Sequence, residues 1–205
     1  VIRFPGGLGR GAVSDALVSH LDFYPTVCDL LGVARPDWLE GESLLPLVRG
    51  EVDSVRDELF AEVTFHAAFE PKRSVRTKDW NYIRNAAAPH PEILPNCDDG
   101  YTKQLWMRHG MADGVVLPEE LYDLTFDPQE RHNLLAADAT AAAVKAREAL
   151  HAKLNAWMEA TDDPLLSDDP SVMPLPQKVN TRDQTHPGGG ASATAWDLGE
   201  WRRIR

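Results

Sequence analysis

The sequence predicts an α/β protein, in which the edge of a larger α/β domain precedes a small domain with an antiparallel β-sheet and a C-terminal helix. Three observations predict this class. Residues 1–32 have the pattern of a strand, a glycine-rich loop and a helix. Residues 74–84 have the pattern of a β-hairpin, and apolar residues recur at helical spacing after residue 138.

The first part of the chain is expected to contain one strand and one helix. Val1 to Phe4 form a short apolar run that Pro5-Gly6-Gly7 ends. Asp22 is placed to cap the helix, and Gly32 is placed to end it. Because strand, loop and helix follow one another, residues 1–70 are assigned to the edge of the larger α/β domain.

Residues 71–160 are expected to form the small domain with its antiparallel sheet. Before this domain, a strand over residues 56–65 leads into a loop over residues 67–71. Within the domain, a hairpin over residues 74–84 has its turn at Lys78-Asp79. Another strand is expected over residues 120–124. Short β-rich runs separated by turn residues are typical of antiparallel strands.

A helix closes the small domain, and a tail follows it. Asp138 is placed to cap this helix. Beyond it the sequence becomes rich in Asp, Pro, Ser and Gly, so residues 161–205 are assigned to a C-terminal extension. The apolar residues at three-to-four-residue spacing in the helix are Ala143, Ala146, Leu150, Leu154 and Trp157.

The composition argues against several classes of partner. The 205 residues include 21 Lys and Arg against 32 Asp and Glu, a net charge of -11. We expect no nucleic-acid partner, because phosphate backbones are bound by clustered cations. No apolar run approaches the roughly 20 residues of a membrane-spanning helix, so no membrane partner is expected. Cys28 and Cys97 are too few for a disulfide framework and lack zinc-ligand spacing.

The candidate binding residues are His66, Glu70 and Arg73. His66 follows a predicted strand, and the ligands of open α/β sheets bind beyond the strand ends. An imidazole, a carboxylate and a guanidinium in one short stretch could meet at one polar or anionic ligand. The alternatives are a loop histidine paired with Glu70 and an arginine that only solvates a sheet face. The sequence has no P-loop, dinucleotide-binding, nucleophile-elbow or zinc-protease motif.

Five segments follow one another along roughly residues 1–160: Val1-Ile-Arg-Phe-Pro-Gly, Asp22-Phe-Tyr-Pro-Thr-Val-Cys-Asp-Leu-Leu-Gly, Gly41-Glu-Ser-Leu-Leu-Pro-Leu, Arg73-Ser-Val-Arg-Thr-Lys-Asp-Trp-Asn-Tyr-Ile-Arg-Asn and Glu120-Leu-Tyr-Asp-Leu-Thr-Phe-Asp-Pro-Gln-Glu-Arg-His-Asn-Leu. In this order they resemble the C-terminal portion of the sulfatases of the alkaline phosphatase superfamily. The stretch Phe65-His-Ala-Ala-Phe-Glu-Pro-Lys-Arg-Ser-Val-Arg is most similar to the heparan N-sulfatase (sulfamidase) branch and its bacterial relatives.

The resemblance implies a hydrolase of sulfate esters or sulfamates on glucosamine-type sugars, such as those of glycosaminoglycans. In sulfatases the nucleophile is a formylglycine made from the Cys of a C-x-P-S-R-type motif, and a Ca2+ ion stabilises the sulfate oxygens. Cys28 is followed by Asp29-Leu30-Leu31 and Cys97 by Asp98-Asp99-Gly100, so neither lies in that motif. The formylglycine and the calcium ligands are therefore expected in an N-terminal sulfatase domain missing from this chain.

Within that division of labour, the chain alone is expected to be inactive. His66 would touch the sulfated group or the leaving nitrogen, and Glu70 and Arg73 would place the sugar substrate. No catalytic or metal-binding residue is expected in the chain. Because Val1 begins the chain inside a strand-like run without an initiator Met, we expect a piece of a longer polypeptide.

Two other functions remain open from the sequence. One is a noncatalytic carbohydrate-binding or interaction domain, whose acidic loops and tail would form the working surface. The other is a phosphonate or phosphodiester hydrolase of the same superfamily. The sequence leaves localisation, oligomeric state and the choice between N-sulfate and O-sulfate undetermined.

Overall fold

The computed structural model describes residues 2–167, 169, 180 and 182–187. The chain divides into two compact units, one formed by residues 1–59 with 76–79 and the other by residues 60–75 with 80–205. In the part of the chain that is described, no helix is both long and apolar enough to cross a membrane.

The first unit is built from short helical elements. Its α-helices are α1, Phe23–Leu31, and α2, Leu45–Arg49, and single 3-10 turns span Pro5–Gly7 and His20–Asp22. No strand is found over residues 2–4, so the prediction of a strand at the start of the chain was wrong. Phe4 has an extended backbone, with φ of -91° and ψ of 143°, but none of the described strands pairs with residues 2–4, and the chain runs directly into the first 3-10 turn.

Helix α1 ends as predicted but begins differently. Gly32 ends it in the left-handed conformation, with a φ of 63°. The carboxylate of Asp22 caps no N–H group of α1. It accepts a hydrogen bond from the backbone N–H of Ser19 at 2.7 Å, and the Ser19 hydroxyl accepts one from Leu21, so the two side chains form a capping box around the preceding 3-10 turn.

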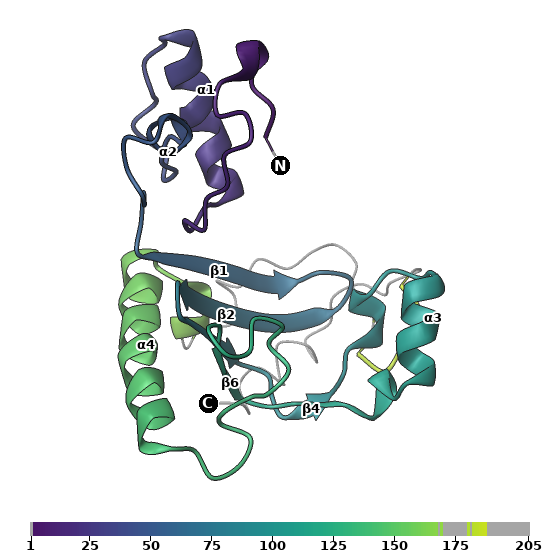
Figure 1. The fold of residues 1–205 in the computed structure, drawn as a ribbon. Helices are drawn as coiled ribbons and strands as arrows, with labels where there is room; N and C mark the ends of the chain where they lie inside the picture. Colours follow the sequence, from purple (N-terminus) through teal and green to yellow (C-terminus); the bar gives the residue numbers. More distant parts are fainter. Residues whose placement is uncertain (1, 168, 170–179, 181, 188–205) are drawn as a thin grey trace. The chain divides into compact units, whose positions relative to one another are not determined.

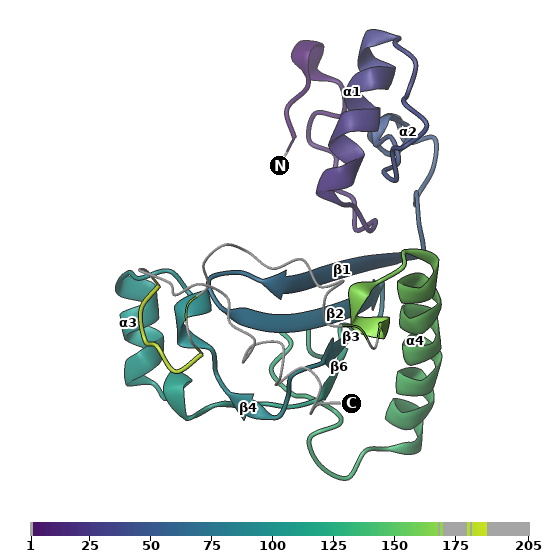
Figure 2. The ribbon, with the colours of Figure 1, turned by 180° about the vertical axis from the view of Figure 1, so that it is seen from behind.

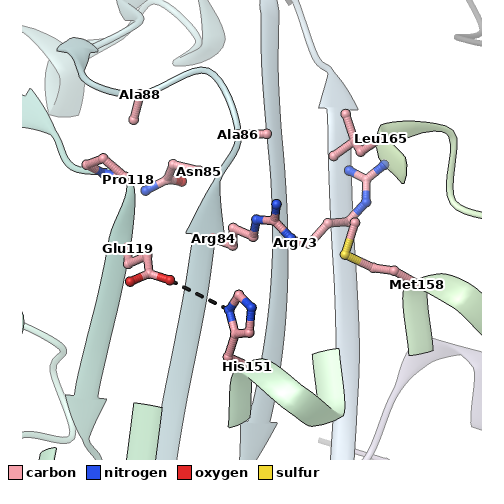
Figure 3. Close-up of a pocket in the computed structure, with 10 residues that line it drawn as sticks. All are labelled: Arg73, Arg84, Asn85, Ala86, Ala88, Pro118, Glu119, His151, Met158 and Leu165. Atoms are coloured by element: carbon pink, nitrogen blue, oxygen red, sulfur yellow. Dashed lines mark ion pairs between the residues drawn. The ribbon is translucent and has the colours of Figure 1, made fainter. Parts of the chain in front are cut away.

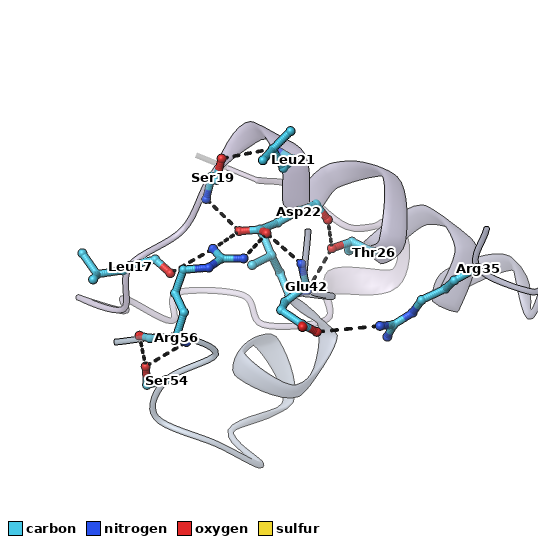
Figure 4. A network of polar contacts seen from close by, with 10 residues as sticks. Leu17, Ser19, Leu21, Asp22, Thr26, Arg35, Glu42, Ser54 and Arg56 are labelled. Carbon is cyan, nitrogen blue, oxygen red and sulfur yellow. Dashed lines mark hydrogen bonds and ion pairs between the residues drawn. The ribbon is translucent and has the colours of Figure 1, made fainter. Parts of the chain in front are cut away.

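The buried carboxylate of Asp22 links three segments of the first unit (Figure 4). It accepts hydrogen bonds from the backbone N–H of Glu42 at 2.9 Å and from the guanidinium of Arg56 at 2.6 Å. The Thr26 hydroxyl donates to the Asp22 carbonyl and accepts a hydrogen bond from the Leu44 N–H at 2.8 Å. Polar contacts at the N-terminal end of α1 therefore fix two segments in place: the one that leads into α2, through Glu42 and Leu44, and the one that contains Arg56.

The second unit contains the predicted antiparallel sheet. Its strands are β1, Glu58–Phe65; β2, Phe69–Thr77; β3, Trp80–Asn85; and β6, Glu119–Asp123, and they lie in the order β1-β2-β3-β6. Short turns join the first three strands, and the turn between β2 and β3 is the predicted Lys78-Asp79. Strand β3 pairs antiparallel with β6, with Tyr82 opposite Leu121.

Strand β2 begins inside the loop predicted over residues 67–71. Phe69, Pro71, Arg73 and Val75 are buried, and the residues between them are more exposed. This alternation is that of a strand with one face on the core. The loop prediction was wrong because a proline and a charged residue, Pro71 and Arg73, occupy the buried face and hide the alternation, which only pairing with neighbouring strands reveals.

The segment between β3 and β6 holds several short elements. Helix α3 lies between the two short strands β4 and β5, which pair antiparallel with His90 opposite Val116. The elements are β4, His90–Pro91; a 3-10 turn, Leu94–Asn96; α3, Tyr101–Arg108; a second turn, Met111–Asp113; and β5, Val115–Val116.

Helix α4, Ala141–Ala160, packs against the sheet and completes the core (Figure 1). Seen from behind, α4 and α3 again lie at opposite ends of the strands (Figure 2). The helix begins later than predicted, because the Thr140 hydroxyl, rather than Asp138, accepts the capping hydrogen bond from the N–H of Ala143 at 3.2 Å. The core residues are Phe69, Val75, Tyr82, Ala87, Leu121, Ala143, Leu150, Leu154, Met158 and Leu165. A last 3-10 turn spans Pro164–Leu166, and most of the predicted extension, 161–205, lies outside the described residues.

Candidate functional site

His66 lies in the bend between β1 and β2, with an exposed side chain. Its backbone N–H donates to the carbonyl of Ala68 at 3.3 Å, which closes the bend. The imidazole therefore extends from a tight connection at the end of a strand, where sequence reasoning placed it. In this position it is available to a ligand at the sheet end.

Glu70 lies four residues further on, at the start of β2, and its side chain is mostly buried. Its carboxylate accepts a hydrogen bond from Asn96 Nδ2 at 2.6 Å and forms an ion pair with Lys72 at 2.5 Å. Asn96 Oδ1 accepts a hydrogen bond from the N–H of Ala68, also at 2.6 Å. Asn96 thus fixes both the bend after His66 and the carboxylate of Glu70.

Sequence reasoning missed Asn96. It belongs to the proline-rich segment that follows β3, and nothing in its local sequence indicates that it reaches β2. The contact depends on the chain returning to the sheet after residue 85, which no local pattern encodes.

Arg73 is buried on the opposite face of β2, with a side chain that is 1% exposed. Its guanidinium donates to both carboxylate oxygens of Asp163, at 3.0 Å for the Nη2–Oδ1 contact, and to the carbonyl of Val63 at 2.8 Å. A further hydrogen bond goes to the hydroxyl of Thr64 at 3.1 Å. These partners use the guanidinium N–H groups that would otherwise be available to bind an anion.

The structure brings the bend at His66 and the carboxylate of Glu70 to one end of the sheet. Arg73 points to the other face of the same strand. Side chains alternate between the two faces of a strand, and Arg73 lies three positions after Glu70. Among the described residues, no hydrogen bond or ion pair joins these three side chains to one another. Substrate binding by His66, Glu70 and Arg73 stays a prediction.

A polar cluster lies where β3 and β6 meet helix α4. The Tyr82 hydroxyl donates to Glu119 Oε1 at 2.5 Å and lies 3.0 Å from Nδ1 of His151. Arg147 donates to Glu119 Oε2 at 3.0 Å. The sequence offered one weak signal for this cluster, the i, i+4 spacing of Arg147 and His151 on the predicted helix.

Burial and charge set the protonation states of this cluster. Burial raises the pKa of the Tyr82 phenol, and the adjacent Glu119 carboxylate adds to the effect. Burial opposes ionisation of Glu119, but hydrogen bonds from Arg147 and Tyr82 prevail and lower its pKa. Burial, followed by the charges of Arg147 and Arg84, lowers the pKa of His151. At neutral pH the cluster therefore contains a neutral phenol, a carboxylate and a neutral imidazole.

The residues implied for the family's chemistry are not found in this part of the chain. No group of three or more His, Cys, Asp or Glu side chains among the described residues could hold a metal ion. The calcium ion that the resemblance implies therefore has no fitting ligand set here. Cys28 is buried in α1, as expected for a small core residue, and Cys97 is half-buried.

Comparison with known proteins agrees with the resemblance seen in the sequence. The family model described as "N-sulphoglucosamine sulphohydrolase, C-terminal" matches residues 1–93. An ulvan-active sulfatase of Formosa agariphila is 29% identical over 180 residues, which are 85% of this chain and 35% of that protein. An N-acetylglucosamine-6-O-sulfatase of Bacteroides thetaiotaomicron is 26% identical over 140 residues, which are 65% of this chain and 20% of that protein.

The solved structure of a 2-O GAG sulfatase is 24% identical, with a TM-score of 0.49, and the match covers 83% of this chain and 31% of that one. The chain spans between a fifth and about a third of the length of the two sulfatase relatives. By its sequence, the chain is similar to the C-terminal portion of sulfatases.

Proposed function

We propose that the chain is the C-terminal part of a hydrolase that cleaves sulfate esters or sulfamates on glucosamine-type sugars. The observation that carries the proposal is the match of residues 1–93 to the C-terminal model of N-sulphoglucosamine sulphohydrolases. This region includes strands β1 to β3, the bend at His66 and the carboxylate of Glu70. The relative named N-acetylglucosamine-6-O-sulfatase supports the same class of sugar.

In this proposal the nucleophile and the cation are supplied by another part of the enzyme. A hydroxyl of the formylglycine hydrate would attack sulfur as the bond to the sugar nitrogen or oxygen breaks, Ca2+ would offset the charge of the sulfate oxygens, and an acid would protonate the departing amine or alcohol. The described residues contribute no cysteine in a formylglycine motif and no calcium ligands. Their task is to shape the sugar-binding side of the site through the bend at His66 and the neighbouring Glu70.

The test compares the chain alone with a longer polypeptide that carries the chain behind a sulfatase domain with a formylglycine motif. Both are assayed with Ca2+ on an aryl sulfate, N-sulfoglucosamine and glucosamine 6-sulfate. The longer protein is expected to release sulfate and the chain alone none. Turnover by the chain alone would overturn the division of labour. Turnover of phosphonates or phosphodiesters but not sulfates by the longer protein would overturn the proposed reaction.

The proposed role of His66 is tested in the longer polypeptide. His66→Ala is expected to lower kcat/KM on the sulfated sugar by about 10-fold or more, as the loss of a positioned acid, base or donor does. The free energy of unfolding should stay unchanged, because the side chain is exposed. The matched control is His132→Ala, whose side chain is 81% exposed and lies on another segment. Equal kinetics for both variants would remove His66 from the site.

A further inference from the structure

A cavity of about 280 Å³ lies in the second unit, between the ends of β3 and β6 and helix α4 (Figure 3). Its polar wall is formed by Arg73, Arg84, Asn85, Glu119 and His151, and apolar side chains, among them Met158, complete the lining. This volume is close to the lower end of the roughly 300–1,000 Å³ of small-molecule sites. It suits a ligand of one ring rather than a chain of several.

Asn85 supplies the first sign that this cavity is built for a ligand. The residue is 3% exposed, and its Nδ2 donates to the carbonyl of Leu117 at 2.6 Å and to Glu120 at 2.7 Å. Because both partners are acceptors, they fix which end of the amide is nitrogen. The Oδ1 atom has no hydrogen-bond partner among the described residues. A buried acceptor without a donor is rare in folded proteins, so a hydroxyl or amine of a ligand is its natural partner.

His151 supplies a second acceptor. The Tyr82 hydroxyl gives its single proton to the Glu119 carboxylate, so its oxygen can only accept from His151 Nδ1. The neutral imidazole therefore carries its proton on Nδ1 and leaves Nε2 as an acceptor. The His151 side chain is 29% exposed, so unlike Asn85 Oδ1 this nitrogen can accept from water, and it is also free to accept from a ligand group that donates.

Arg84 supplies the positive charge. Its Nη1 donates to Asn155 Oδ1 at 3.2 Å, and within the described part of the chain it forms no ion pair. The carboxylate of the cavity wall, Glu119, already forms an ion pair with Arg147. In Figure 3 the guanidinium of Arg84 extends from β3 across the sheet toward Arg73, and the imidazole of His151, on α4, lies near the Arg84 side chain. Arg73, which also lines the cavity, is paired with Asp163, so among the described residues Arg84 is the lining cation without an ion pair, and it lies beside two neutral acceptors.

We propose that this cavity binds a single sugar unit that carries an acidic group, with its carboxylate or sulfate on Arg84 and its hydroxyls donating to Asn85 Oδ1 and His151 Nε2. The choice of a sugar rests on the proposed function, whereas the requirement for one anionic group and two donors follows from the cavity itself. The site is separate from the bend at His66 and adds a second contact for a polymeric substrate. Such a contact raises the effective concentration of the substrate at the reacting end.

The test measures binding to the full 205-residue chain at pH 7 by isothermal titration, with glucuronate, glucosamine 6-sulfate, glucose and inorganic sulfate as probes. Both acidic sugars are expected to bind at least tenfold more tightly than glucose or sulfate alone. A preference for glucuronate or for glucosamine 6-sulfate identifies which acid the site takes. Sulfate that binds as tightly as the sugars, or no saturable binding of any probe, would overturn the proposal.

Three variants at two arginines distinguish binding in the cavity from an effect of net charge. Arg84→Gln is expected to weaken binding of the acidic sugars at least tenfold, and Arg84→Lys is expected to weaken it less. Arg108→Gln removes the same charge from the exposed end of α3 and should leave binding unchanged. Equal weakening by Arg84→Gln and Arg108→Gln would show that net charge alone is responsible and would overturn the site.

The outcome can be told apart from the outcome of the hydrolysis assay. Binding in the cavity without sulfate release by the longer polypeptide would retain this site and reject the proposed function. Sulfate release without binding of acidic sugars to the chain would do the reverse.

Discussion

The carboxylate of Asp22 is fully buried and accepts four hydrogen bonds. Two come from backbone N–H groups and two from the terminal nitrogens of Arg56. Burial opposes ionisation of Asp22, but the bonds from Arg56 and the backbone prevail and lower its pKa. Breaking a buried ion pair from one side leaves the other charge without compensation, which costs about 3 kcal/mol or more. Arg56→Met should therefore destabilise the first unit by that amount.

The measurement is hydrogen exchange at the Leu44 N–H, which depends on the same network. Arg35→Met is the control, because its ion pair with Asp29 is more exposed to solvent and should contribute less than about 1 kcal/mol. The lowered pKa also fixes a pH dependence. Asp22 stabilises the folded state fully above its unfolded pKa of about 3.9, and this contribution is lost as the pH falls through the lower folded value. Similar exchange rates in both variants would contradict the role given to Asp22.

Gly41 is constrained by space rather than by its dihedral angles. A Cβ at this position would lie 2.1 Å from the carbonyl oxygen of Leu21. Because the neighbour is backbone, Gly41→Ala should destabilise the first unit by about 2 kcal/mol or more through strain. Gly100→Ala is the control, since a Cβ there would meet nothing within 4 Å. A fully folded Gly41→Ala variant with the stability of Gly100→Ala would show that the two segments can separate at no cost.

At the scale of the element, α4 depends on its buried stripe. Leu154 is 0% exposed and lies in the core, whereas Val144 on the same helix is 42% exposed. Leu154→Ala should lower the free energy of unfolding of the second unit by about 2–5 kcal/mol, because it removes buried apolar surface and leaves a cavity. Val144→Ala should change it by less than about 1 kcal/mol. Urea denaturation followed by circular dichroism compares the two, and equal losses would show that α4 is not anchored by this stripe.

At the scale of the whole molecule, the pair Arg73–Asp163 ties β2 to the segment after α4, across 90 residues of sequence. Both side chains are 1% exposed. Arg73→Met leaves the Asp163 carboxylate buried without its partner and should destabilise the second unit by about 3–5 kcal/mol. Hydrogen exchange should become faster in β3 and β6 and remain unchanged at Leu44 in the first unit. Faster exchange in both units would show that they unfold together.

Much of the fold could be predicted from local patterns. The turn at Lys78-Asp79, the end of α1 at Gly32 and the apolar stripe of α4 all depend on residues close in sequence. The beginning of strand β2, before residue 74, and the N-terminal strand were predicted incorrectly. The beginning of β2 is held by its neighbours in the sheet, whereas residues 2–4 have no described strand to pair with.

The candidate site was less accessible to sequence reasoning than the fold. The exposed position of His66 follows from a strand end, which the sequence indicates. The burial of Arg73 follows from a carboxylate 90 residues away, and the contact of Glu70 with Asn96 follows from the return of a proline-rich segment. His151 showed no role until Tyr82 and Glu119 were brought beside it.

The sequence by itself determined the family resemblance, the hairpin, the last helix and the lack of a formylglycine motif in this chain, because each is encoded by residue types at short spacing. The tertiary structure decided which charged and polar groups are paired within the protein and which remain free to bind a ligand. That distinction depends on pairing between residues distant in sequence: Asp163 occupies Arg73, while Arg84 and the amide oxygen of Asn85 face a cavity. Burial makes these pairings strong, and burial is a property of the folded chain rather than of any local pattern.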